Sequence, residues 1–133
     1  MTVKLRLMVI DDEPIVGKRL KQLLEKTGYI VEAFTESSTA VEELEKTHFD
    51  IIVTDLKMDG IDGMKILEIA RKKNPDTKVI IITGFSKMET ATEAFNKGAF
   101  DFIVKPFKIE ELKQVIQKAE MELIKNNYKP LRH

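Results

Sequence analysis

The sequence predicts an α/β fold: a doubly wound, five-stranded parallel sheet with five helices. Two observations carry this prediction. Short apolar runs rich in β-branched residues alternate with stretches of helical periodicity along the 133 residues. Each strand–helix unit also has about the length that a parallel crossover connection needs. Because the crossover helices cover both faces of such a sheet, its central strands are expected to be apolar throughout.

The first strand and helix are predicted from an apolar run and its boundary residues. Leu5 to Ile10 is the run, and Pro14 suits the first turn of the helix that follows. Gly28 is expected to end that helix, because glycine readily adopts the left-handed conformation found there. Residues 29–34 alternate in polarity, which predicts a second strand at or near a sheet edge.

The middle of the chain predicts another helix, a buried strand and a further helix. Thr39-x-x-Glu42 fits a capping box that starts a helix running to about Thr47. Residues 51–54 are apolar or β-branched, and this strand stops abruptly at Asp55. A helix is then expected over about 64–73, before Asn74-Pro75-Asp76 breaks the pattern.

The last third of the chain predicts two strands and two helices. Residues 78–82 form the fourth strand, and Ser86-x-x-Glu89 predicts a second capping box for a helix that Gly98 closes. Residues 101–104 form the fifth strand. The final helix is expected from about Ile109 past Ile124, with an apolar stripe on one face.

Composition limits the classes of function. Lys plus Arg and Asp plus Glu number 22 each, so a net charge of zero offers no case for direct nucleic-acid or membrane binding by the domain. There is no cysteine, which excludes disulfides and thiolate metal sites and suits a cytoplasmic protein. No segment has transmembrane length. We expect one domain over residues 1–126, with 127–133 as a tail or the start of a linker.

Reactive side chains follow four of the five predicted strands at their carboxyl ends: Asp11 and Asp12, Asp55, Thr83, and Lys105. These ends meet at one edge of a parallel sheet, so the side chains are expected to converge. Close carboxylates repel one another, and a hard cation such as Mg²⁺ relieves that repulsion. Lysine and hydroxyl donors suit phosphoryl oxygens, and an aspartate can accept phosphate covalently. The set therefore predicts metal-assisted phosphoryl transfer onto an aspartate.

This spacing resembles the receiver domain of bacterial two-component response regulators over about residues 4 to 120. The run from Thr83-Gly84-Phe85 to Gly98-Ala99-Phe100-Asp101-Phe102-Ile103-Val104-Lys105-Pro106-Phe107 is most similar to receivers of the nitrogen-regulator type. The resemblance implies a flavodoxin-like fold with the strand order 2-1-3-4-5 known from the chemotaxis receiver. It also implies a phosphorylation-dependent signalling switch rather than an enzyme that turns over a separate substrate.

By the same resemblance, Asp55 is the expected phosphoacceptor. Asp12 and Asp55 would bind Mg²⁺ directly, together with the main-chain carbonyl of Lys57, while Asp11 would act mainly through water. Lys105 would pair with the phosphoryl oxygens.

The remaining implied roles concern switching and access. Thr83 would move towards the phosphoryl group, and Phe102 would follow it as the switch aromatic. Gly84 would leave the phosphodonor a path, while Phe85, together with Lys57, would tune how long the phosphoryl group survives. Lys105-Pro106 is expected to be a cis peptide, which only an X-Pro bond reaches at low energy.

The resemblance implies a sensor histidine kinase or a phosphotransfer protein as donor. It also implies a downstream protein or output domain that binds a face within residues 87–126. A homodimer through the last helix is a further expectation, because Met121, Ile124 and Tyr128 form a second apolar stripe.

Two rival functions remain open at this stage. A phosphatase or mutase of the haloacid-dehalogenase type also uses an aspartyl phosphate, but it needs an acid two residues after the nucleophile, where this chain has Lys57. A receiver-like module that binds partners without phosphorylation is the other rival. It would be marked by loss of an acid or of the lysine, and here all of them are present.

Overall fold

The computed structural model describes residues 4–58, 60–84 and 87–128, with only the backbone described at 127 and 128. One parallel sheet has the strand order β2-β1-β3-β4-β5. The strands are β1 (Arg6–Ile10), β2 (Ile30–Phe34), β3 (Ile51–Asp55), β4 (Lys78–Thr83) and β5 (Asp101–Val104). The helices are α1 (Pro14–Glu25), α2 (Ser37–Lys46), α3 (Gly63–Lys73), α4 (Met88–Asn96) and α5 (Ile109–Tyr128). The predicted fold and strand order are confirmed.

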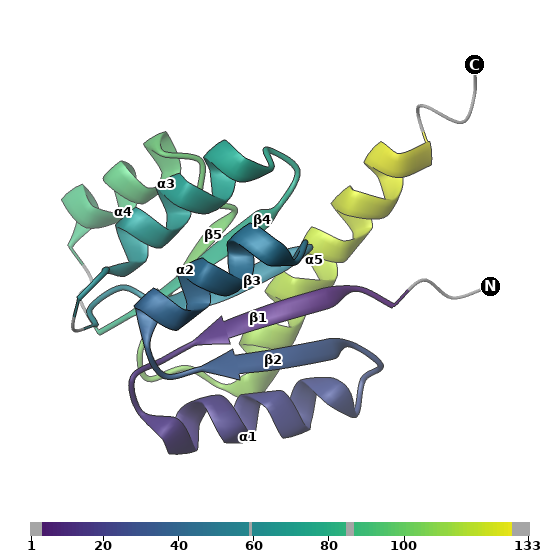
Figure 1. Cartoon of the computed structure of the whole chain (residues 1–133), viewed down its shortest axis with the longest axis horizontal. Coiled ribbons are helices and arrows are strands. Elements are labelled where there is room, and N and C mark those ends of the chain that lie inside the picture. The colour runs from purple at the N-terminus through teal and green to yellow at the C-terminus, as the bar shows by residue number, and fades with distance from the viewer. Residues whose placement is uncertain (1–3, 59, 85–86, 129–133) are drawn as a thin grey trace.

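The helices form a layer on each face of the sheet. Helices α1 and α5 cover one face, and α2, α3 and α4 cover the other (Figure 1). One apolar core therefore joins α1 and α5 to the sheet, with Leu24 and Leu112 fully buried in it. A second core lies on the opposite face and includes Phe49 and Leu67.

The burial of the strands follows their place in the sheet. In β3, residues Ile51 to Thr54 are all buried, as expected for a central strand with helices on both faces. In β2, Val31 alone is buried, and β2 lies at one edge of the sheet as predicted. Strand β5 lies at the other edge.

The predicted start of α2 was wrong. The helix begins at Ser37, and Glu36 occupies the N-cap position without a side-chain capping bond. Thr39 is therefore already inside the first turn, where its hydroxyl cannot cap the helix. The Ala40 N–H donates to the carbonyl of Glu36, which closes that turn three residues earlier than the capping-box motif indicated.

Other helix boundaries differ by a few residues. Helix α1 ends at Glu25, before Gly28, which nevertheless has the positive φ (100°) expected of it. The N-cap of α4 is Lys87, without a side-chain capping bond. The second predicted capping box starts at Ser86, which lies outside the described residues, so that box stays a prediction. Gly98 follows α4 in the predicted left-handed conformation.

Helix α5 is the longest helix of the described chain. It runs through Tyr128, past the predicted domain boundary after residue 126, and that boundary stays a prediction. The hydroxyl of Tyr29 donates to Glu120 at 2.6 Å, which ties α5 to the start of β2. Among the described helices, none is long and apolar enough to cross a membrane.

Candidate functional site

The predicted site residues converge at the carboxyl edge of the sheet. Asp11 and Asp12 follow β1, while Asp55 and Thr83 are the last residues of β3 and β4. Lys105 follows β5, and its N–H donates to the carbonyl of Thr83 at 2.8 Å. Parallel pairing along the sheet thus aligns the ends of four strands that are far apart in the sequence.

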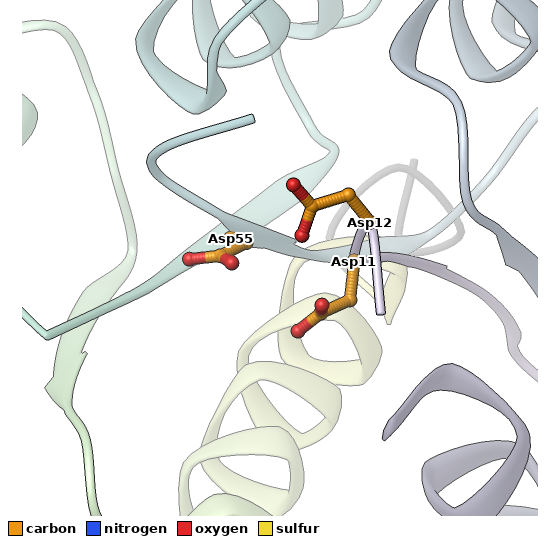
Figure 2. Close-up of side chains that lie close together, drawn as sticks. All are labelled: Asp11, Asp12 and Asp55. Atoms are coloured by element: carbon orange, nitrogen blue, oxygen red, sulfur yellow. The ribbon is translucent and has the colours of Figure 1, made fainter. Parts of the chain in front are cut away.

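Three carboxylates form the centre of the site. One oxygen from each of Asp11, Asp12 and Asp55 lies within 4.8 Å of the others. Figure 2 shows the three side chains gathered at the ends of their strands. Asp11 is buried, Asp55 is half-buried and Asp12 is exposed. The Asp11 carboxylate also accepts a hydrogen bond of 2.9 Å from the N–H of Glu13, which orients it at the start of the β1–α1 loop. An oxygen-rich, partly open set of this kind suits Mg²⁺.

Lys105 pairs with two of the three carboxylates. Its Nζ lies 3.2 Å from Asp55 Oδ2 and 3.6 Å from Asp11 Oδ2. Burial alone would lower the pKa of the Lys105 ammonium, but the two carboxylates outweigh this effect and raise it. Lys105 therefore stays charged and provides a fixed cation beside Asp55.

The Asp55 carboxyl experiences opposing effects. Burial raises its pKa above the ordinary value, and the charge of Asp11 adds to that rise. The Lys105 ammonium and the Leu56 N–H act in the other direction without cancelling the rise. The surroundings of Asp55 thus disfavour its charged form, and a bound cation would stabilise that form.

The switch and access residues lie around this centre. Thr83 is buried at the end of β4, and Phe102 packs partly buried against the core beneath α2, α3 and α4. Gly84 is exposed, and a Cβ placed there would meet nothing within 4 Å, so the space beside it is open. Phe85 lies outside the described residues. Lys57 has an exposed side chain.

The remaining predicted feature concerns the backbone after β5. The peptide bond between Lys105 and Pro106 is cis, as predicted.

Two residues that the sequence analysis did not single out shape the loop after Asp55. A Cβ on Gly63 would lie 2.5 Å from the carbonyl oxygen of Asp55, so only glycine fits there. The Ser37 hydroxyl accepts a hydrogen bond of 3.0 Å from the N–H of Ile61, across 24 positions of sequence.

Asp62 caps α3 through the Lys65 N–H at 2.9 Å. An Asp-Gly pair before an apolar run is a signal that could have located the start of this helix.

Known proteins are similar to this chain over most of its length. The family model described as "Response regulator receiver domain" matches residues 7–117. The regulatory protein AtoC of Escherichia coli K12 is 34% identical over 119 residues, which is 90% of this chain and 26% of that protein. The nitrogen assimilation regulatory protein NtrX of Azorhizobium caulinodans is 30% identical over 115 residues, 85% of this chain and 25% of that protein.

A solved structure shows the same arrangement. The beryllofluoride-activated NtrC4 receiver domain dimer superposes with a TM-score of 0.83 at 33% identity, over 89% of this chain and 98% of that one. These similarities bear out the predicted likeness to receivers of the nitrogen-regulator type. The chain spans about a quarter of the length of these two regulators, AtoC and NtrX.

Proposed function

Because this chain belongs to the family of response regulator receiver domains, and is therefore a phosphorylation-dependent signalling switch, we propose that Asp55 is its phosphoacceptor. The observation that carries the proposal is the position of the Asp55 carboxylate, at the end of β3 and 3.2 Å from Lys105. Its side chain is partly exposed, so an incoming phosphodonor can reach it, whereas Asp11 is buried.

The proposed reaction is a displacement at phosphorus. An oxygen of Asp55 attacks the phosphoryl group of a phosphohistidine, an acyl-phosphate bond forms, and the phosphorus–nitrogen bond breaks. The leaving imidazole keeps the electron pair of that bond and takes up a proton. Lys105 pairs with the phosphoryl oxygens, and the Thr83 hydroxyl donates to another of them. Both residues are at strand ends beside Asp55, which supports these roles.

We propose that the carboxylate cluster holds Mg²⁺. The donor set fits, because three carboxylates lie close together and a hard divalent cation prefers oxygen ligands with several waters retained. Asp12 and Asp55 would bind it directly, with the main-chain carbonyl of Lys57, and Asp11 would act through water. When bound, the ion would neutralise charge on the phosphoryl oxygens.

Phosphorylation is proposed to act through Thr83 and Phe102. Thr83 ends β4, and Phe102 lies on the neighbouring strand β5, paired with Ile81 two residues before Thr83. The close packing of these adjacent strands supports a coupled movement of Thr83 and Phe102. Gly84 leaves open space for the donor, and Phe85 with Lys57 would set the lifetime of the acyl phosphate. The face that changes lies within residues 87–126, where Met88, Phe95 and Val104 are exposed apolar side chains.

The proposed partners follow from that switch. A sensor histidine kinase or a phosphotransfer protein donates the phosphoryl group, and a downstream protein or output domain binds the altered face. Turnover of a separate substrate and direct nucleic-acid binding are not part of the proposed role. A homodimer through α5 is also proposed, supported by exposed Met121 and Ile124 and by the dimeric state of the NtrC4 receiver.

The experiment is intact-mass measurement after incubation with acetyl phosphate and Mg²⁺. Asp55→Asn is compared with the wild type, and Asp76→Asn, an exposed acid in the α3–β4 turn, is the matched control. One Mg²⁺-dependent phosphoryl adduct is expected in the wild type and the control and none in Asp55→Asn. An adduct that survives in Asp55→Asn would move the acceptor elsewhere, and turnover of an added phosphomonoester would favour the enzyme alternative.

A further inference from the structure

The loop between β3 and α3, residues 56–62, carries the one main-chain group in the proposed metal site, the carbonyl of Lys57. A side-chain ligand can adjust through its rotamers, whereas a main-chain carbonyl points wherever the loop directs it. The contacts that fix the conformation of this loop therefore also fix the direction of the Lys57 carbonyl. Only those contacts can hold the Lys57 carbonyl in place before a cation arrives.

The base of the loop is closed by main-chain bonds. The Leu56 N–H donates to the carbonyl of Ile82 at 2.8 Å, and the Gly63 N–H donates to the carbonyl of Leu56 at 2.8 Å. These bonds join the loop to β4 and to the start of α3. They do not involve the part of the loop around Gly60 and Ile61, called the far limb below, which has a different contact.

Ser37 holds that far limb. Its Oγ accepts a hydrogen bond of 3.0 Å from the Ile61 N–H, and a Cβ placed on Gly60 would lie 3.5 Å from the same oxygen. Gly60 has a φ of +83°, a conformation that glycine adopts without strain, so the limb turns back sharply at this point. The hydroxyl thus lies against the turn of the loop.

Ser37 is itself well placed to act as a fixed point. It is 3% exposed and lies in the first turn of α2, where Glu36 occupies the N-cap position. A pocket of 590 Å³ has Ser37 in its wall, together with Asp12, Pro14, Gly60 and Ile61. Ser37 therefore shares this pocket with a carboxylate that would bind the cation and with the loop that carries the carbonyl.

We propose that Ser37 is a positioning residue of the metal site: its hydroxyl, by accepting from the Ile61 N–H, holds the β3–α3 loop so that the Lys57 carbonyl is ready to bind the cation. The proposal rests on the proposed Mg²⁺ site. It assigns to a buried serine of α2 an indirect role in the reaction centre, exerted through the Ile61 N–H.

The test compares Ser37→Ala with Ser38→Ala, which makes the same chemical change at the next residue, an exposed one. Mg²⁺ itself is the probe, titrated into the unphosphorylated chain by calorimetry. Loss of one neutral hydrogen bond predicts a dissociation constant about three- to tenfold higher in Ser37→Ala. Ser38→Ala is expected to match the wild type, and Ser37→Thr, which keeps the hydroxyl, is expected to recover part of the affinity.

A second measurement, amide hydrogen exchange, begins with the wild type and then follows the same amide in Ser37→Ala. In the wild type, the Ile61 amide is expected to exchange with solvent more slowly than the same amide in the unfolded chain, because it donates to Ser37. In Ser37→Ala its exchange is expected to accelerate while that of the β3 amides stays unchanged. If Ser37 only stabilised the fold, Ser37→Ala would lower the free energy of unfolding and accelerate exchange at many amides, without a selective change at the Ile61 amide.

The possible failures can be told apart. If the wild type does not bind Mg²⁺, the proposed metal site is wrong. If the wild type binds and Ser37→Ala binds equally well, or Ser38→Ala weakens binding by the same factor, the positioning role is wrong. Rapid exchange of the Ile61 amide in the wild type would also overturn it.

Discussion

The Asp55 carboxylate lies where burial and neighbouring charge act against each other. Burial is the largest influence on its pKa and raises it, while Lys105 at 3.2 Å offsets part of the rise. A carboxyl whose pKa is raised by folding binds its proton more tightly in the folded state than in the unfolded one. The free energy of unfolding therefore falls as the pH rises from the ordinary value, 3.8, through the raised value.

Asp55→Asn is expected to stabilise the metal-free protein. The amide keeps nearly the same shape without the buried charge. The free energy of unfolding at neutral pH is therefore expected to be about 1 kcal/mol higher than in the wild type, as measured by thermal unfolding. The difference is expected to shrink below the raised pKa, where the wild-type carboxyl is protonated. Added Mg²⁺ should stabilise the wild type more than the variant.

The control for this measurement is Asp76→Asn, because Asp76 is exposed and outside the cluster. Its unfolding midpoint should follow the wild type across the pH range. An Asp55→Asn variant that is less stable than the wild type at neutral pH without metal would contradict the account of a disfavoured charge.

At the scale of elements, the site depends on how closely α3 approaches the end of β3. Gly63 opens α3, and its N–H donates to the carbonyl of Leu56 at 2.8 Å. A Cβ at this position would lie 2.5 Å from the Asp55 carbonyl oxygen and 2.8 Å from the Leu56 Cα. Both of those atoms belong to the backbone, so neither can move aside as a side-chain tip could.

Gly63→Ala is expected to destabilise the fold by about 2–3 kcal/mol, since the extra methyl forces a shift of the backbone. The same shift should displace Asp55 and weaken Mg²⁺ binding. Chemical denaturation and Mg²⁺ titration measure the two effects.

Gly17→Ala is the matched control for Gly63→Ala. Gly17 lies inside α1, where a Cβ would meet Ala33 Cβ at an ordinary 3.5 Å. Alanine should stabilise that helix by about 1 kcal/mol, because glycine is the poorer helix former. If Gly63→Ala and Gly17→Ala both change the free energy of unfolding only slightly, position 63 does not require glycine.

At the scale of the whole molecule, α5 has two different faces. One face is buried in the core with α1 and the sheet, where Leu112, Ile116 and Ala119 are fully covered. The other face exposes Met121 by 70% and Ile124 by 42%. Adjacent apolar side chains on one exposed helix are typical of a contact surface, which supports the proposed dimer.

Met121→Glu is expected to weaken that dimer about tenfold or more, because association would bury a charge without a partner. Analytical ultracentrifugation with and without acetyl phosphate measures the effect. Ile15→Glu is the control, since Ile15 on α1 is also 70% exposed. A wild type that stays monomeric at high concentration in both states would rule out the dimer.

Local sequence patterns were sufficient to predict the kinds and order of the elements and the location of the reactive residues. Apolar runs and helical stripes are local patterns, so β1 to β5 were each placed to within a residue or two. The ends of those runs carry Asp12, Asp55 and Lys105, and parallel strands bring such ends to one edge. Local pattern plus the rule of parallel packing was enough to locate the cluster.

The contacts that hold the cluster in place are visible only in the folded chain. The start of α2 at Ser37 and the contact of its hydroxyl with Ile61 join segments that are 24 positions apart, and no local motif encodes that pairing. The need for glycine at position 63 arises from a neighbouring backbone that occupies the space of a side chain. Contacts across a packed interior depend on the positions of several elements at once, so they appear only when the chain is folded.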